Sequence, residues 1–344
     1  MPTLDGDNVT GALMFFAYMV AALVLTGLIC RDLLNEYSTT RRECHTQSRD
    51  KNGNETKGRR SNETQAQVSI IAALATLSFA ALSYHMLNFL IQSYQSWAPS
   101  DSLRDVSMSK IWRWSTKSTL FQDFAETINN DPGRFWWTNL ALTYTFGWNV
   151  YMTVEGARHS IPHLWAYFLL DQILPVSFTQ NVFCLALLMR REKSDTTLRT
   201  LNPSSPGLQV LLVTTLVGIL RTGPSSVGTA SFLPLVLITR ALVLAPVLLL
   251  RPRNSQTEAG VHSQAQSSSR ASRLGQHESR WALALTIASI ALQIAKGLSE
   301  SSITELWTGL NSSPAVSALG YDALIGMVSL GVFMLMDDKT TAVR

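Results

Sequence analysis

The segment from Phe121 to Phe183 places acidic, amide and histidine side chains inside or beside runs of apolar and aromatic residues. Burying such polar groups in hydrocarbon costs several kcal/mol unless they are paired or hydrated, so they are rarely found there without a role. Aromatic rings stabilise nearby cations, and more strongly when water is excluded. An acid in such a setting can protonate a weakly basic, apolar molecule.

Asp171 is the first candidate for this acid. It interrupts an otherwise apolar stretch, 161–189, which is long enough to cross a bilayer. An ionisable residue there is by default a hypothesis for a functional site, and a structural hydrogen bond between helices is the alternative. Pro175, one turn later, is expected to kink the helix and free a backbone carbonyl group.

Three further carboxyl groups are candidate acids. Asp123 and Glu126 are three residues apart, so on a helix they share a face. That face is either a solvated surface or a site beside Trp136 and Trp137, where loss of solvent would favour the protonated acids. Glu155 is the fourth candidate, at the end of a second apolar stretch.

Aromatic residues in the stretch 135–155 are candidate walls of a substrate cavity. Tyr144 and Trp148 are four residues apart and share one face of the expected helix. Trp136 and Trp137 also fit the aromatic belt that marks a membrane interface, and this is the better interpretation of that pair.

Four polar residues could orient a substrate or remove a proton: His85, Asn88, His163 and Gln180. Asn88 belongs to a stripe with Tyr84 and Gln92 at helical spacing, which we expect to face other helices or a cavity. Packing through interhelical hydrogen bonds is as good an explanation as lining a pocket.

Arg240 and Asp322 are the remaining charges inside apolar stretches. An unpaired charge there would be costly, so we expect the two to form a structural ion pair across two helices.

The chain has 344 residues, of which 46% are hydrophobic, and these are concentrated in long runs. Backbone groups in lipid must be satisfied within the segment, which favours helices. We therefore expect an all-α, polytopic transmembrane helical bundle of seven or eight spans, forming a single domain over 1–344. The candidate spans are Thr10–Cys30, Val68–Ser93, Phe135–Glu155, Ile161–Met189, Gly207–Leu220, Ala230–Leu250, Trp281–Leu298 and Ala315–Met336.

Three polar segments separate these spans. The segment 31–66 is expected to be a solvated polar loop. The segment 95–134 mixes tryptophan and phenylalanine with charges, which predicts an amphipathic helix on the membrane or capping the bundle. The segment 253–280 is rich in Ser, Gln and Arg and is expected to be a flexible loop.

Basic residues after the fourth span and between the sixth and seventh place both of those loops in the cytosol. With eight spans, the glycosylation sequons at Asn54, Asn62 and Asn311 would then all be lumenal. Basic residues in the first loop favour the reverse, and seven spans would reconcile the charges. The expected location is the endoplasmic reticulum membrane, as an integral, multi-pass protein.

Several classes of function are disfavoured. The net charge of +4 reflects basic loops, so no nucleic-acid surface is expected. The three cysteines have no metal-ligand spacing. The chain contains no nucleotide-binding loop, no HExxH, no GxSxG and no DDxxD segment. We therefore expect no metal and no cofactor.

The blocks SYHMLNFLIQSYQSWA, FQDFAETI, RFWWTNLAL and DQILPVSFTQNVF resemble the fungal integral-membrane terpene cyclases of ascofuranone and macrophorin biosynthesis. The likeness covers roughly residues 83–189 and the multi-span architecture. It implies cyclisation of a farnesyl chain on an aromatic or cyclohexenone head group, started by protonation of a terminal olefin or an epoxide without a metal or redox cofactor. The implied partners are a lipophilic prenylated substrate, the lipid bilayer and, functionally, a prenyltransferase and an epoxidase.

The residues and the resemblance together predict a membrane-bound terpene cyclase acting on a farnesylated meroterpenoid substrate or its epoxide. A transporter or receptor-like protein for a lipid or small metabolite is the alternative, because buried polar groups fit it equally well. Against a transporter, the chain shows no paired half-repeats interrupted by Gly and Pro. A scaffold protein is disfavoured by the number of acids in apolar stretches.

Overall fold

The computed structural model describes residues 8–47, 55–193, 229, 234, 238–244, 284, 287–288 and 290–342. These residues form helices joined by turns, and no β-strand occurs among them. The expected all-α class is therefore confirmed for this part of the chain. The helices are α1 Val9–Gln47, α2 Glu55–Trp97, η1 Leu103–Asp105, α3 Met108–Lys117, α4 Leu120–Asn129, α5 Pro132–Arg158, α6 Leu164–Ile173, α7 Val176–Lys193, α11 Ile303–Leu310 and α12 Pro314–Ala342.

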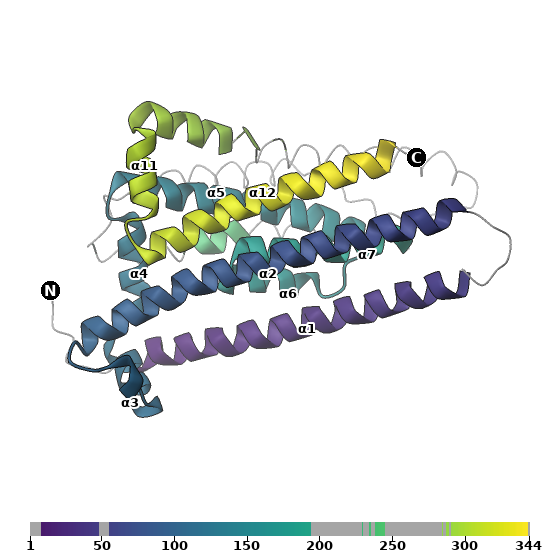
Figure 1. Ribbon diagram of the computed structural model, residues 1–344. Coiled ribbons are helices and arrows are strands. Elements are labelled where there is room, and N and C mark those ends of the chain that lie inside the picture. Colours follow the sequence, from purple (N-terminus) through teal and green to yellow (C-terminus); the bar gives the residue numbers. More distant parts are fainter. Residues whose placement is uncertain are drawn as a thin grey trace, which may run out of the picture.

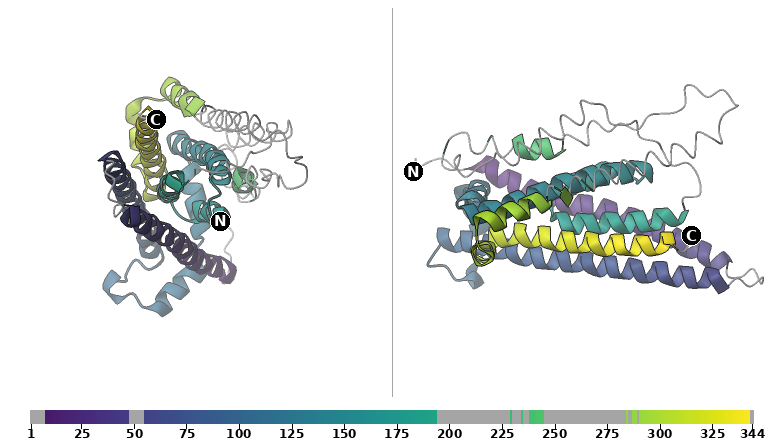
Figure 2. Two further views of the ribbon diagram at one scale, coloured as in Figure 1. Left: turned by 90° about the vertical axis from the view of Figure 1, so that its right-hand side faces the viewer. Right: turned by 90° about the horizontal axis from the view of Figure 1, so that it is seen from above.

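The long helices α1, α2, α5 and α12 run lengthwise through the molecule, and the short helices α3, α4 and α11 lie towards one end (Figure 1). Helix α2 packs against α7 and α12, while α12 also contacts α5 and α7. Helix α1 contacts α6 and α3. The other two views show the same neighbours, with α2 and α12 side by side (Figure 2).

Three of the described helices are long and apolar enough to cross a membrane: Val9–Thr39, Gln65–Trp97 and Pro314–Met336. Large apolar side chains on their outer surfaces are exposed, for example Leu23 at 75%. Such surfaces are stable against lipid rather than water. These helices coincide with the first, second and eighth predicted spans.

The total of seven or eight spans stays a prediction. Helix α5 covers the third predicted span and is long, but it is not among the three apolar candidates. The fourth is divided into α6 and α7. The fifth predicted span, 207–220, and the predicted loop 253–280 lie outside the described residues, and the sixth and seventh spans are described only in part.

The prediction of a polar loop at 31–66 is wrong for most of that segment. Helix α1 continues to Gln47 and α2 begins at Glu55, while residues 48–54 lie outside the described residues. The segment contains no proline, and its many Arg, Lys, Gln and Glu residues are good helix formers. Polarity alone thus did not end the helices, which extend past their apolar portions.

The predicted amphipathic segment 95–134 contains η1, α3 and α4. Ser107 caps α3 by accepting a hydrogen bond from the Lys110 backbone amide. Trp114 of α3 and Leu120 of α4 are buried against Tyr94 of α2. These short helices therefore join the bundle through a small aromatic core of their own.

Local sequence fixes both ends of α5. At its start, Asp131 accepts a hydrogen bond from the Arg134 backbone amide, and Pro132 occupies the first helical turn. The helix ends at Arg158, and the turn that follows contains two positive-φ residues, Ser160 and His163. This turn reverses the chain so that α6 packs against α5.

Candidate polar site at the break between α6 and α7

The predicted span 161–189 is two helices rather than one kinked helix. Helix α6 ends at Ile173 and α7 begins at Val176, with Leu174 extended between them. Pro175 lacks an amide proton, which suits the residue before a helix but not a helix interior. The break leaves the first amides of α7 in need of acceptors inside the protein.

Asp322 of α12 supplies these acceptors. Its Oδ2 and Oδ1 atoms accept hydrogen bonds from the Val176 and Ser177 backbone amides, both at 2.8 Å. The side chain is buried. A carboxylate at a helix N-terminus also interacts favourably with the helix dipole. Asp322 is therefore a capping residue whose two oxygens are both occupied.

The expected ion pair between Arg240 and Asp322 is not formed. Arg240 lies in the described helical segment 238–244, and its Nη1 atom donates to the Gln172 carbonyl oxygen at 3.2 Å. That carbonyl is in the last turn of α6, where cations are favourable. The two charges are thus satisfied on opposite sides of the same helix break, which sequence spacing could not reveal.

Asp171, the first candidate acid, is buried in α6 with 4% of its surface exposed. One oxygen, Oδ2, accepts a long hydrogen bond of 3.4 Å from the neighbouring Gln172 side chain. The other oxygen, Oδ1, has no hydrogen-bond partner among the described residues. A buried oxygen left open in this way is able to exchange a proton with a bound molecule.

Asn149 of α5 lies beside Asp171 and is completely buried. Its side-chain amide is the hydrogen-bonding neighbour of the Asp171 carboxylate. Within the part of the chain that the structure describes, no contact of its Nδ2 or Oδ1 atom is as short and as well aligned as an ordinary hydrogen bond. The Asn149 amide of α5 and the Asp171 carboxylate of α6 thus form a weakly bonded polar pair. Sequence reasoning missed Asn149, although its place in the apolar run FGWNVYM was a usable signal.

An aromatic cluster is formed by side chains of the same helices and of α7. The Trp148 ring lies 5.4 Å from that of Tyr151 and 5.6 Å from that of Phe183, and Phe183 also meets Tyr167 edge-on at 5.5 Å. The four rings come from α5, α6 and α7 and belong to the main apolar core. Trp148 is thus packed in the core, and its role as a wall of a substrate cavity stays a prediction.

Tyr144 and Gln180, two predicted substrate contacts, are instead bonded to each other. The Tyr144 hydroxyl donates to Oε1 of Gln180, and Nε2 of Gln180 donates to the Gly326 carbonyl oxygen at 2.9 Å. Both side chains are fully or almost fully buried. This network ties α5, α7 and α12 together.

A second buried amide, Asn181, was missed from sequence as an anchor of the same helices. Its Nδ2 atom donates to the Ser177 carbonyl at 2.8 Å and to the Ser78 and Ser329 hydroxyls, both at 3.2 Å. Asn181 thus joins α7 to α2 and α12.

Glu155 is engaged by Arg158 and His159 at the end of α5. Its carboxylate lies 3.4 Å from Nη1 of Arg158 and 3.3 Å from Nε2 of His159. The helix continues through Gly156, so the pairing with His159 forms as the four-residue spacing allows. Among the candidate acids, this one is held in a salt bridge.

Asp123 and Glu126 lie on α4, away from the helix break (Figure 1). Asp123 is exposed and accepts a hydrogen bond of 2.9 Å from Thr119, while Glu126 accepts one of 2.7 Å from Gln122. Partial burial raises the pKa of Asp123 above its ordinary value, and the nearby Glu126 carboxylate adds to this, although the Thr119 hydrogen bond opposes it. The structure does not bring this pair together with Asp171.

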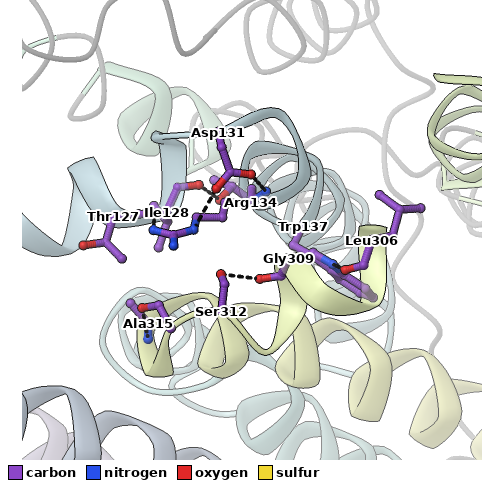
Figure 3. Close-up of polar contacts among 11 residues, drawn as sticks. Thr127, Ile128, Asp131, Arg134, Trp137, Leu306, Gly309, Ser312 and Ala315 are labelled. Atoms are coloured by element: carbon purple, nitrogen blue, oxygen red, sulfur yellow. Dashed lines mark hydrogen bonds and ion pairs between the residues drawn. The ribbon is translucent and has the colours of Figure 1, made fainter. Parts of the chain in front are cut away.

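Trp136 and Trp137 anchor the start of α5. Their indole nitrogens donate to the carbonyl oxygens of Gln293, at 3.0 Å, and Leu306, at 2.8 Å. The second bond is visible in Figure 3, which shows the contacts between the α5 start and the segment around α11. Close packing here depends on glycine, since a Cβ at Gly309 would lie 3.2 Å from the Gly133 backbone.

The stripe on α2 does not face the bundle as predicted. Tyr84 is 64% exposed and Gln92 is also exposed, while Asn88 is half-buried. His85 stacks on Tyr321 of α12, with ring centres 5.2 Å apart. The physical reason is that α2 packs against α7 and α12 through another face, on which Leu82 is buried.

His163 links α6 to α1. It precedes α6 in a left-handed conformation, and its Nδ1 atom lies 2.6 Å from Oδ2 of Asp32. The sequons are placed separately: Asn311 is exposed at the end of α11, Asn62 belongs to α2, and Asn54 lies outside the described residues.

No protein-family model, curated protein or solved structure matches this chain. Across the described ranges, no group of three or more His, Cys, Asp or Glu side chains is arranged to hold a metal ion. The functional interpretation therefore depends on the geometry at the break between α6 and α7.

Proposed function

We propose that this protein is a membrane-bound terpene cyclase that acts on a farnesylated phenol-type substrate or its epoxide, started by proton transfer from Asp171. The observation that supports the proposal most directly is the buried Asp171 carboxyl group, which lies beside Asn149 and has one oxygen without a hydrogen bond of ordinary geometry among the described residues. We further propose that the chain is a multi-pass protein of the endoplasmic reticulum membrane. A substrate dissolved in the bilayer would reach such a site from the lipid.

In the proposed reaction, the Asp171 O–H bond breaks and its electron pair stays on the carboxylate. The proton bonds either to a carbon of the terminal alkene, whose π electrons form the new C–H bond, or to the epoxide oxygen, whose bond to the more substituted carbon then breaks to leave a hydroxyl group. The carbocation that results is attacked by the next double bond, so that carbon–carbon bonds form and the ring closes. Loss of a proton to a base ends the sequence and leaves an isomer of the substrate. A well-placed general acid contributes about 10²–10⁴-fold in rate, and exclusion of water protects the cation.

Asp171 fits this role better than the other candidate acids. Glu155 is held by Arg158 and lies beside His159, and both oxygens of Asp322 accept hydrogen bonds from backbone amides. Asp123 and Glu126 are on α4 and are bonded to neighbouring polar side chains. A farnesylated substrate is made by a prenyltransferase, and its terminal epoxide by an epoxidase. These two enzyme classes would therefore act before the proposed cyclase.

The proposal is tested with membranes from cells that express the protein. A farnesylated phenol and its terminal epoxide are added in the presence of a chelator, and products are identified by mass and by nuclear magnetic resonance. We expect a cyclic isomer of equal mass from at least one substrate. Asp171→Asn should lower turnover by at least about 100-fold, whereas Glu126→Gln, the control, should not. Full turnover by both variants would overturn the assignment of the acid.

A transporter or lipid-binding receptor is the second candidate, and the helix break favours it specifically. Interrupted helices occur at the binding sites of membrane transporters. In this structure the α7 end of the break is occupied by Asp322 and the α6 end by Arg240, so a ligand would bind beside these residues. The chemical fate of the ligand distinguishes the two functions, because a carrier returns the carbon skeleton unchanged.

A further inference from the structure

The pair formed by α6 and α7 begins and ends at the same height of the bundle. Just before α6, Nδ1 of His163 lies 2.6 Å from Oδ2 of Asp32. Towards the end of α7, Nη2 of Arg190 lies 3.3 Å from Oε2 of Glu36. Asp32 and Glu36 are about one turn apart on α1. The chain therefore returns to the same part of α1 after passing through both helices.

The two helices run antiparallel and meet at a tip inside the bundle. Along the pair, the ring of Tyr167 in α6 lies 5.5 Å from that of Phe183 in α7. At the tip, the first amides of α7 bond to Asp322 of α12. At a rise of about 1.5 Å per residue, Asp322 lies about 12 Å along α12 from Pro314. Because Pro314–Met336 is apolar and long enough to cross a membrane, the tip lies within the apolar layer.

Neither helix of the pair is long enough to cross a membrane alone. Helix α6 has 10 residues and is about 15 Å long. The apolar part of α7, Val176–Arg190, is about 22 Å long, whereas the hydrocarbon core is about 30 Å thick. Non-helical backbone at this depth is tolerated only where protein covers it or water reaches it. Asp322 and Arg240 provide that cover, because they bond to the two sides of the break.

We infer that α6 and α7 form a re-entrant hairpin, which enters the membrane from the cytosolic side and returns to it without crossing. The ends of α1, α5, α7 and α12 and the start of α2 lie at the end of the molecule from which the hairpin enters (Figure 1). Among the described residues, the basic ones in these parts of the helices are Arg31, Arg41, Arg42, Lys57, Arg59, Arg60, Arg158, Arg190, Arg191, Lys193 and Lys339.

The opposite end of the described bundle has fewer basic residues, namely Arg104, Lys110, Arg113, Lys117, Arg134 and Lys296. An excess of Lys and Arg marks the cytosolic side of a membrane protein. When the stretch 161–189 is counted as a span, the basic residues of the first loop and those after α7 require opposite orientations. The hairpin removes this conflict, because it places both groups on one side.

The same arrangement separates two of the sequons. At a rise of about 1.5 Å per residue, Asn62 lies about 35 Å along α2 from His85. His85 stacks on Tyr321, whose hydroxyl group donates to Oδ1 of Asn311 at 3.1 Å. Because this length exceeds the hydrocarbon core of about 30 Å, Asn62 and Asn311 lie on opposite sides of the membrane. Asn311 is then lumenal and Asn62 is cytosolic, so the sequons do not share one side.

Cysteine labelling in sealed microsomes tests this topology. The full-length protein, with its three native cysteines replaced by alanine, carries one new cysteine at a time. The variants are Ser160→Cys before α6, Arg190→Cys in α7 and Ser109→Cys on α3 at the opposite end. A membrane-impermeant maleimide linked to polyethylene glycol gives a gel shift wherever it reaches a thiol. We expect Ser160→Cys and Arg190→Cys to shift before the membrane is permeabilised, and Ser109→Cys only after detergent is added.

The other outcomes identify which part is wrong. Labelling of Ser160→Cys and Arg190→Cys from opposite sides would mean that the segment crosses the membrane, and it would overturn the hairpin. Labelling of Ser109→Cys alone before permeabilisation would overturn entry from the cytosolic side. The hairpin depends on the proposed membrane location but not on the proposed reaction. Labelling of all three before permeabilisation, with release of the protein by alkaline carbonate, would reject that location, whereas the product assay alone decides the reaction.

Discussion

Replacing Asp322 should destabilise the bundle at the α7 N-terminus. Asp322→Ala removes both acceptors of the Val176 and Ser177 amides, which are 2.8 Å from its oxygens. These amides are at a break in the chain, where the helix itself offers them no partner. Asp322→Asn retains one acceptor oxygen, so it should have an intermediate effect.

The magnitude follows from the two hydrogen bonds. Loss of a capping side chain costs about 0.5–2 kcal/mol, and each buried amide left unpaired costs about 1–3 kcal/mol. The cost of losing a cap already includes part of the cost of an unpaired amide. We therefore expect Asp322→Ala to lower the free energy of unfolding by about 2–4 kcal/mol. By the same reasoning, Asp322→Asn should lower the free energy of unfolding by about 1–2 kcal/mol.

The assay is reversible unfolding in mixed micelles, combined with hydrogen exchange at Val176 and Ser177. Asp123→Ala is the control, because an exposed carboxylate should contribute within about 0.5 kcal/mol. Faster exchange confined to the start of α7 would identify loss of the cap. A free energy of unfolding for Asp322→Ala equal to that of the native protein would refute the capping role.

Two further predictions concern helix packing and pH. Gly326→Ala should destabilise the protein by about 1–3 kcal/mol, because its Cβ would lie 2.6 Å from the Tyr144 ring. Thermal unfolding measures this effect. The control is Gly331→Ala on the same helix, whose Cβ meets nothing within 4 Å and which should be neutral. For Asp123, burial raises the pKa in the folded state, so the folded protein binds the proton more tightly than the unfolded chain. The native protein should therefore gain stability relative to Asp123→Asn as the pH falls from 7 towards about 4. Unfolding of both proteins at the two pH values measures this difference. A loss of relative stability at the lower pH would contradict burial as the cause of the raised pKa.

The sequence predicts the helical class and the apolar stretches well, because both depend on local composition. The first, second and eighth predicted spans each coincide with a long apolar helix. The end of a helix is harder to predict when polar residues are good helix formers, as the continuation of α1 to Gln47 shows. Pro175 correctly marks an interruption, although it produces two separate helices rather than a kink.

The partners of buried polar groups could not be predicted, since they depend on which helices become neighbours. Asp322 and Arg240 are both rare charges in apolar stretches, yet each finds its partners in the backbone. Gln180 looks like a binding residue in sequence and is occupied by Tyr144 and Gly326. Asn149 shows the same dependence, because only the structure reveals that it lies beside Asp171 of the neighbouring helix.

The cap on α7 also has a consequence for how the chain is made. Asp322 follows Val176 by 146 residues. At a synthesis rate of about 5–20 residues per second, the ribosome needs on the order of 10 s to deliver the acceptor after α7 has emerged. During that interval the first amides of the nascent α7 must donate hydrogen bonds to water or to another acceptor, such as one supplied by the translocation machinery. The cap on α7 can therefore form only after the Asp322 part of α12 has been synthesised.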